Sequence, residues 1–126
     1  MPHPTWNIEL SEAAVAWLRA CHRQPEPQRQ VARHFQRIFD LLSEHGTWIG
    51  MPYVRHIRGA LWEARVTHPT GSYRMFFGVG PGRTVAVACG DVKKSERFPP
   101  RVYNWAEREV VAYLALLADR ESSQGE

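Results

Sequence analysis

Two lysines stand side by side in the stretch GDVKKSERFPP, at positions 93 and 94. Lys93 and Lys94 are the only lysines in the chain, and the other 14 basic residues are all arginine. Arginine keeps its proton at any relevant pH, whereas lysine can lose its proton when it is buried or lies beside other cations. The pair could therefore transfer a proton in a reaction, or it could bind phosphate as two fixed charges.

A second pair of cations is predicted where two strands meet. Residues 60–67 and 72–79 alternate between hydrophobic and polar positions, and the HPTG sequence between them is typical of a tight turn. Counting back from the turn places Arg65 opposite Arg74, with about 5 Å between their Cβ atoms. Two arginines at this distance repel each other unless an anion, a carboxylate or solvent separates them. The functional interpretation is a phosphate held by both guanidinium groups, and the structural one is the carboxylate of Glu63 on the same face.

Positive charge gathers in the middle of the chain. Residues 52–108 hold ten basic and four acidic residues, a net charge of +6. Residues 1–51 are neutral overall, and residues 109–126 carry a net charge of −3. A cationic segment between neutral and acidic ends indicates a surface that binds an anion, and the alternative is ordinary solvated surface charge.

The elements that must position these residues follow from hydrophobic periodicity. Alternation predicts short strands, a helical spacing of apolar residues predicts helices, and Ser11 can cap the first helix. In chain order the predicted elements are a strand at 5–10, helices at about 12–22 and 27–45, strands at 53–57, 60–67, 72–79 and 83–92, and a helix at about 100–120.

This order predicts an α+β fold with an N-terminal strand and helical hairpin, an antiparallel meander of about four strands, and a C-terminal helix. The helices are expected against one face of the sheet, and residues 83–92 are expected to form its central strand. Residues 1–120 are predicted to be a single domain, followed by a disordered tail at residues 121–126.

Composition limits the class of protein. No apolar run approaches the roughly 20 residues that span a bilayer, and the N-terminus shows no secretory signal. We therefore expect a cytoplasmic protein with no membrane partner. The six histidines show no spacing typical of metal ligands, so we expect no metal and no cofactor.

The motifs, taken in order, resemble the RelE/ParE toxin superfamily, and most closely its HigB-like, phage-derived branch. That branch has a hydrophobic-Glu-x-Arg sequence, a turn, a Tyr-Arg-hydrophobic sequence, a strand, two lysines, and then a proline and a helix. The resemblance extends over residues 30–118 and reaches the N-terminus only by topology, and it implies a RelE-like fold. The matching positions here are 61–65, 73–75, Lys93 with Lys94, and Pro99 or Pro100.

The resemblance implies the toxin of a type II toxin–antitoxin system, an endoribonuclease that cleaves mRNA on the ribosome and so inhibits translation. In this reaction a ribose 2′-OH attacks its own 3′ phosphodiester, which needs a base, an acid and cations but no metal. By position, Arg74 matches the phosphate-stabilising arginine of the family. The other catalytic candidates are Arg65, Lys93, Lys94 and Tyr103, and the RNA-binding candidates are Arg55, Arg58, Arg97 and Arg101.

The implied partners are the ribosome, mRNA and a co-expressed antitoxin, which we expect to be a small helix-turn-helix protein. Two other functions stay open, because fold does not settle function. One is a ParE-like inhibitor of DNA gyrase, and the other is a catalytically inactive module that only binds the antitoxin. The basic group around Arg65 and Arg74 favours RNA, because gyrase inhibition needs no cluster that cleaves phosphodiesters.

Overall fold

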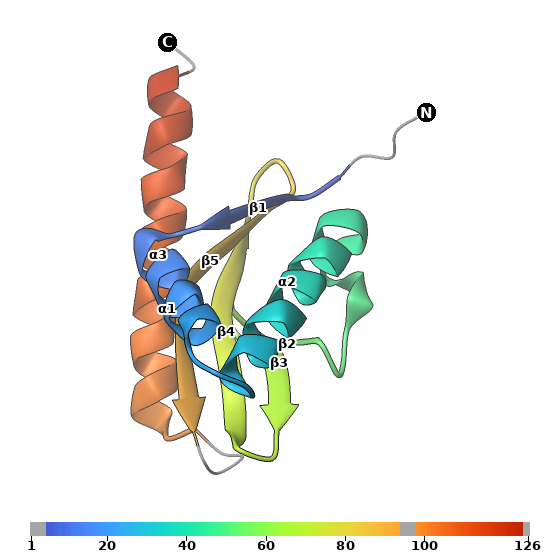
Figure 1. Cartoon of the computed structure of the whole chain (residues 1–126). Helices are drawn as coiled ribbons and strands as arrows, with labels where there is room; N and C mark the ends of the chain where they lie inside the picture. The colour runs from blue at the N-terminus through green and yellow to red at the C-terminus, as the bar shows by residue number, and fades with distance from the viewer. Residues whose placement is uncertain (1–4, 94–97, 125–126) are drawn as a thin grey trace.

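The structure, a computed structural model, describes residues 5–93 and 98–124 (Figure 1). The helices are α1 (Glu12–Arg23), α2 (Gln28–His45), the 3₁₀ helix η1 (Gly46–Ile49) and α3 (Pro100–Gln124). The strands are β1 (Asn7–Leu10), β2 (Val54–Arg58), β3 (Leu61–His68), β4 (Gly71–Gly80) and β5 (Thr84–Lys93). They form one sheet in the order β1-β5-β4-β3-β2.

The predicted α+β fold and its order of elements are confirmed. β2 to β5 form the antiparallel meander, and β1 adds a fifth strand that runs parallel to β5. The prediction that residues 83–92 form the central strand is wrong, because β4 occupies the centre. The short turns before and after β4 pair it with both of its neighbours in the chain, and β1 then covers part of the outer edge of β5.

Helices cover both faces of the sheet, so the expectation that they lie against one face is wrong. Tyr73, Met75 and Phe77 of β4 pack with α1 and α2, whereas Phe76 packs with α3 around Ala106. The long apolar run in β4 makes both of its faces hydrophobic, and each face therefore needs a cover. Figure 1 shows α3 on one side of the sheet and α2 on the other.

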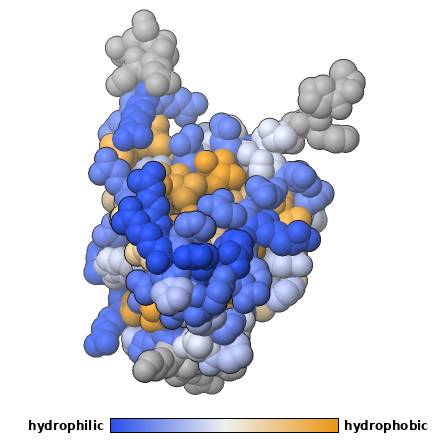
Figure 2. Space-filling view, viewed as in Figure 1, coloured by the Kyte–Doolittle hydropathy of each residue, from blue (hydrophilic) through white to orange (hydrophobic). Residues whose placement is uncertain are grey.

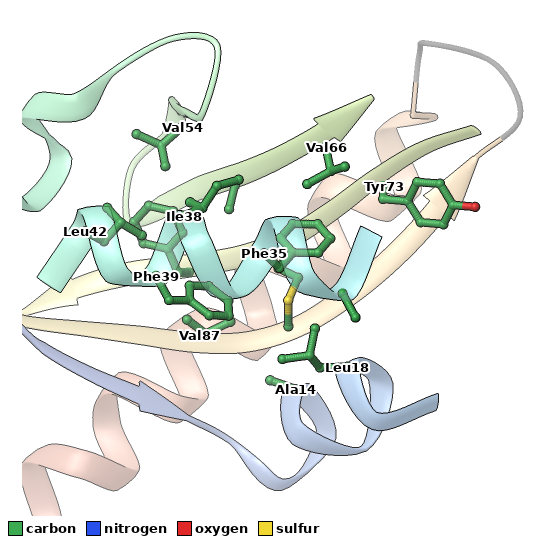
Figure 3. Packing of buried hydrophobic residues seen from close by; sticks show 14 of the residues in the cluster. Ala14, Leu18, Phe35, Ile38, Phe39, Leu42, Val54, Val66, Tyr73 and Val87 are labelled. Atoms are coloured by element: carbon green, nitrogen blue, oxygen red, sulfur yellow. The ribbon is translucent and has the colours of Figure 1, made fainter. Parts of the chain in front are cut away.

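The α1–α2 hairpin forms the larger half of the core. Ser11 caps α1 as predicted, because its hydroxyl accepts a hydrogen bond from the backbone N–H of Ala14 at 3.0 Å. The helical stripe of α2 is buried, and Figure 3 shows Phe35, Ile38 and Leu42 pointing from α2 toward the sheet. Burying such side chains supplies most of the stability of a helix in a protein.

α3 lies close to the sheet because β4 carries a glycine beneath it. A Cβ atom at Gly78 would lie 2.6 Å from Val110 Cγ1 and 2.9 Å from Leu114 Cδ1, so only glycine allows this approach. Arg58 of β2 also binds Glu107 of α3, with 3.3 Å between Nε and Oε1. These contacts fix α3 and, with it, the side chains of its first turns.

The outer surface is largely hydrophilic, with hydrophobic residues exposed in patches on the face that Figure 2 shows. Within residues 5–93 and 98–124, no helix has the length and apolar character to cross a membrane. α3 extends to Gln124, so residues 121–124, which were expected in the tail, are helical. Residues 125–126 lie outside the described part of the chain.

Candidate functional site

Arg65 and Arg74 are direct partners in the register between β3 and β4, as predicted. Strand alternation then places Glu63 on the same face, two residues before Arg65, and Arg55 of β2 opposite Glu63. This is the face that α3 covers farther along, since Leu61 and Phe76 pack with α3. Three arginines from three neighbouring strands therefore surround one carboxylate.

Glu63 is the centre of this group and is completely buried, at 0% exposed. Its Oε1 lies 3.0 Å from Arg55 Nη2 and 3.8 Å from Arg65 Nε, and its Oε2 lies 3.4 Å from Arg74 Nε. A buried carboxylate needs such partners, because removing a single charge from water is costly. The sequence did not decide whether a phosphate or the Glu63 carboxylate lies between Arg65 and Arg74. In the structure the Glu63 carboxylate lies beside both.

The group keeps a positive excess, because three guanidinium groups meet one carboxylate. Arg74 is the most buried of the three arginines, at 3% exposed. Its Nη1 donates a hydrogen bond to the carbonyl of Tyr73 at 3.1 Å, and its Cζ lies 5.6 Å from the ring centre of Phe98. Burial lowers the pKa of Arg74, and the charge of Glu63 opposes that shift. The guanidinium remains charged, because arginine does not lose its proton in proteins at any relevant pH.

A cleft of about 440 Å³ opens above this group. Arg55 and Arg65 reach into it from the side, with side chains that are 48% and 21% exposed. Within the described part of the chain, Ser72 Oγ is buried without a hydrogen-bond partner. The Nε atoms of Arg65 and Arg74 and both oxygens of Glu63 are also buried without a well-aligned hydrogen bond, so charge rather than hydrogen bonding holds this group together. The lining residues are Arg55, Arg65, Thr67, Ser72, Arg74, Phe98 and Tyr103.

Tyr103 places a phenol at the wall of the cleft from the first turns of α3. Its ring packs edge-on against Phe76, with 6.1 Å between ring centres. Burial raises the pKa of Tyr103, as does the charge of Glu63, while Arg55 and Arg74 act in the opposite direction. The phenol is therefore neutral at physiological pH and can donate a hydrogen bond or a proton.

Lys93 lies on the face of the arginine group. β5 continues to Lys93, which pairs with Ser72, while Asp91 pairs with Arg74. The sequence did not tell which of the two lysines shares the face of Arg74, and the register assigns Lys93. It is half-buried and does not line the cleft itself. Lys94 lies outside the described residues, as does Arg97.

Two of the predicted RNA-binding arginines lie away from the cleft. Arg58 is bound to α3 through Glu107, and its Nη2 also donates to Asn104. Arg101 is exposed in the first turn of α3 and does not line the cleft. Of the residues predicted by sequence, the structure brings Arg55, Arg65, Arg74 and Tyr103 together in one cleft.

Sequence reasoning missed three lining residues. Thr67 and Ser72 are a facing pair next to the turn, and their small polar side chains widen the cleft beside the arginines. The paired alternation already indicated their position. Phe98 precedes the double proline, and no local pattern indicated that its ring packs under Arg74 and against Phe76.

The comparison with known proteins adds a family. Residues 22–111 match the family described as phage derived protein Gp49-like (DUF891), and no curated protein matches the chain. The matched range includes every residue that lines the cleft and leaves out β1 and most of α1. The chain therefore belongs to the phage-derived Gp49-like family, which is related to the RelE toxins of toxin–antitoxin systems.

Proposed function

We propose that this protein is the toxin of a toxin–antitoxin pair, in the HigB-like branch, and that it cleaves mRNA on the ribosome. The observation that carries the proposal is the cleft in which Arg55, Arg65 and Arg74 surround a buried carboxylate beside the phenol of Tyr103. Arginine forks suit phosphate oxygens, and a neutral phenol suits a leaving oxygen. The relation of the Gp49-like family to RelE toxins supports the same reading.

In the proposed reaction the 2′-oxygen of one ribose attacks the adjacent phosphorus and loses its proton. The bond from phosphorus to the 5′-oxygen of the next nucleotide breaks, and that oxygen takes up a proton. The products are a 2′,3′-cyclic phosphate and a 5′-hydroxyl, and no metal or cofactor takes part. Negative charge develops on the non-bridging oxygens, and the fixed cations of the cleft stabilise it.

The three arginines of the cleft and Tyr103 each have a role in this proposal. Arg55 and Arg65 bind the non-bridging oxygens, because their side chains are the accessible ones. Arg74 lies beneath them and holds Glu63, which in turn orients Arg55 and Arg65. Tyr103 donates its proton toward the leaving 5′-oxygen, and the raised pKa of Tyr103 keeps the phenol protonated before the reaction.

Lys93 has two possible roles, both next to this cleft. It either transfers a proton, as base or acid, or it binds an RNA phosphate as a fixed charge. Its pairing with Ser72, which lines the cleft, supports a role beside the cleft. Lys94, Arg97 and Arg101 remain candidates for contacts with RNA or the ribosome outside the cleft.

An antitoxin is the second partner that we propose. The net charge of +6 over residues 52–108 attracts an acidic protein segment, and such complementarity speeds association. Binding over the cleft would cover Arg55 and Arg65. We expect the complex to be the stable form in growing cells and the free chain to accumulate poorly.

One observation favours a rival, the inactive module that only binds the antitoxin. Glu63 occupies the space between Arg65 and Arg74, and Arg74 is almost completely buried. In that case the arginines stabilise the fold and bind no substrate. Against this rival, the side chain of Arg55 is 48% exposed although it pairs with Glu63, so it can also contact a ligand.

A cell-free translation extract separates the possible functions. Added protein should stop translation of a reporter mRNA, and Arg65→Met should restore it, with Arg29→Ala as a control on the exposed surface of α2. A gyrase supercoiling assay in parallel should show no inhibition. Normal translation with inhibited gyrase would support the ParE-like alternative, and an inert protein in both assays would support the inactive module.

A further inference from the structure

A second hollow lies on the other side of the β3 edge. Its volume is about 350 Å³, and its lining mixes cations with an aromatic ring. Figure 1 shows α2 crossing in front of β2 and β3, and this hollow is formed where α2 meets the end of β3. The lining residues are His34, Arg37, Ile38, Pro52, Tyr53, Arg65, Val66 and Thr67.

The two hollows share a boundary, because Arg65 and Thr67 line both. The Arg65 side chain reaches both sides: its Nε lies 3.8 Å from Glu63, and its Nη1 donates to Met51 Sδ at 3.1 Å. A thioether is a weak acceptor, so a phosphate oxygen can replace it at little cost. β2 pairs only with the first half of β3, which leaves Thr67 at an open edge between the hollows.

The second hollow has the chemistry of a single-stranded RNA site. Arg37 and His34 are exposed on α2 and form no ion pair with the rest of the described chain. Tyr53 is 38% exposed, and its carbonyl accepts the backbone N–H of Arg65 at 2.8 Å, which fixes its backbone against the β3 edge. An aromatic face beside cations binds an unpaired base and its phosphate without sequence-specific contacts.

We propose that His34, Arg37 and Tyr53 form a subsite for a flanking nucleotide, so that one RNA strand runs from the arginine cleft over the β3 edge. In this subsite Arg37 binds a backbone phosphate and Tyr53 stacks on a base. Arg65, which binds the reacting phosphate in the proposed reaction, lies at the boundary between the two hollows. The proposal rests on the proposed function, because it extends the RNA path of the same cleft to the opposite face of the sheet.

The test measures binding of two fluorescent RNA oligonucleotides, roughly four and roughly ten nucleotides long, which lie within the range of single-stranded sites. Both carry 2′-O-methyl groups, so that cleavage cannot occur. Wild-type protein should bind the longer RNA more tightly. The double variant His34→Ala/Arg37→Ala should lose about tenfold in affinity for the longer RNA and nothing for the shorter one, with a shallower salt dependence. Arg29→Ala is the charge-matched control on α2 and should change neither affinity.

A second variant keeps the test independent of charge. Tyr53→Ala should weaken only the longer RNA, while Tyr53→Phe should bind like the wild type, because stacking needs the ring and not the hydroxyl. If the double variant binds both RNAs like the wild type but still stops translation, the subsite is wrong and the proposed function stands. If wild type binds neither RNA but binds an acidic peptide, and the double variant loses that peptide, the hollow serves a protein partner and the proposal fails.

Discussion

Arg65 and Arg74 face each other across β3 and β4, and both lie beside the same buried carboxylate. Opposed like charges on neighbouring strands destabilise a sheet unless a counter-charge is present. Glu63 supplies it at 3.8 and 3.4 Å. Glu63 therefore has two effects. Its carboxylate stabilises the two arginines in the fold, and it also fixes their positions in the cleft.

Glu63→Gln should destabilise the fold strongly. The change keeps the shape of the side chain and leaves three guanidinium groups with no counter-charge, and breaking a buried ion pair typically costs about 3–5 kcal/mol. We expect the free energy of unfolding, measured in urea, to fall by an amount of this order. Adding Arg74→Met to Glu63→Gln should recover part of the loss, because it removes the most buried of the repelling charges. Equal stability of wild type and Glu63→Gln would show that the carboxylate does not stabilise the arginine group.

Tyr103→Phe should separate catalysis from folding. The ring contacts with Phe76 and Phe98 remain, so the fold should keep its stability, while the proton donor is lost. Loss of a general acid typically costs about 10²–10⁴ in rate. We expect ribosome-dependent cleavage to fall within that range, measured by gel analysis of a labelled mRNA, with unchanged binding to ribosomes. Full activity of the phenylalanine variant would remove Tyr103 from the reaction.

The raised pKa of Tyr103 also predicts a pH dependence of stability. The folded chain holds the phenol proton more tightly than the unfolded chain, whose tyrosine pKa lies near 10. The contribution of Tyr103 is therefore fully present below that value and is lost as the pH rises through the folded pKa. Wild type should therefore lose unfolding free energy relative to Tyr103→Phe across this alkaline window, whereas the two should be about equally stable at neutral pH. A phenol that titrates in the folded protein at the ordinary tyrosine pKa would contradict the assigned environment.

Lys93→Arg should decide between the two roles of Lys93. The change keeps the positive charge and the phosphate contact but removes a group that can give up its proton. If Lys93 transfers a proton, the variant should stop cleaving mRNA while it still co-sediments with ribosomes. Normal cleavage by Lys93→Arg, together with weakened ribosome binding by Lys93→Ala, would leave only the docking role.

The sequence predicted the elements and the hairpin register well, because both depend on local rules. The HPTG turn and the alternation beside it were enough to place Arg65 opposite Arg74. The same alternation placed Glu63 on their face but did not tell whether its carboxylate reaches them. Whether the carboxylate reaches the arginines depends on how deeply Glu63 is buried, and α3 sets this burial by packing over the neighbouring residues.

What the sequence did not predict depends on contacts between distant segments. β1 pairs with β5 across the whole helical hairpin, and no local pattern indicates a parallel partner. The close approach of α3 at Gly78 brings Glu107 against Arg58, which the sequence had placed among the RNA-binding candidates. Arg37 and His34 were counted in a neutral part of the chain, and only the fold brings them to the edge of β3 beside Arg65.

The most direct test of the proposed function is the chemistry of the RNA ends after reaction on translating ribosomes. Sequencing methods that distinguish terminal groups should find a 2′,3′-cyclic phosphate, or the 3′-phosphate from its hydrolysis, upstream of each cut and a 5′-hydroxyl downstream. Arg65→Met should reduce these ends by about 10²-fold or more, in line with the loss of a group that stabilises developing charge. Arg74→Met should also reduce them, because Arg74 holds the carboxylate that orients Arg55 and Arg65. Intact mRNA in the presence of folded protein, or ends with a 5′-phosphate, would contradict the proposal that this cleft cleaves RNA through its 2′-hydroxyl.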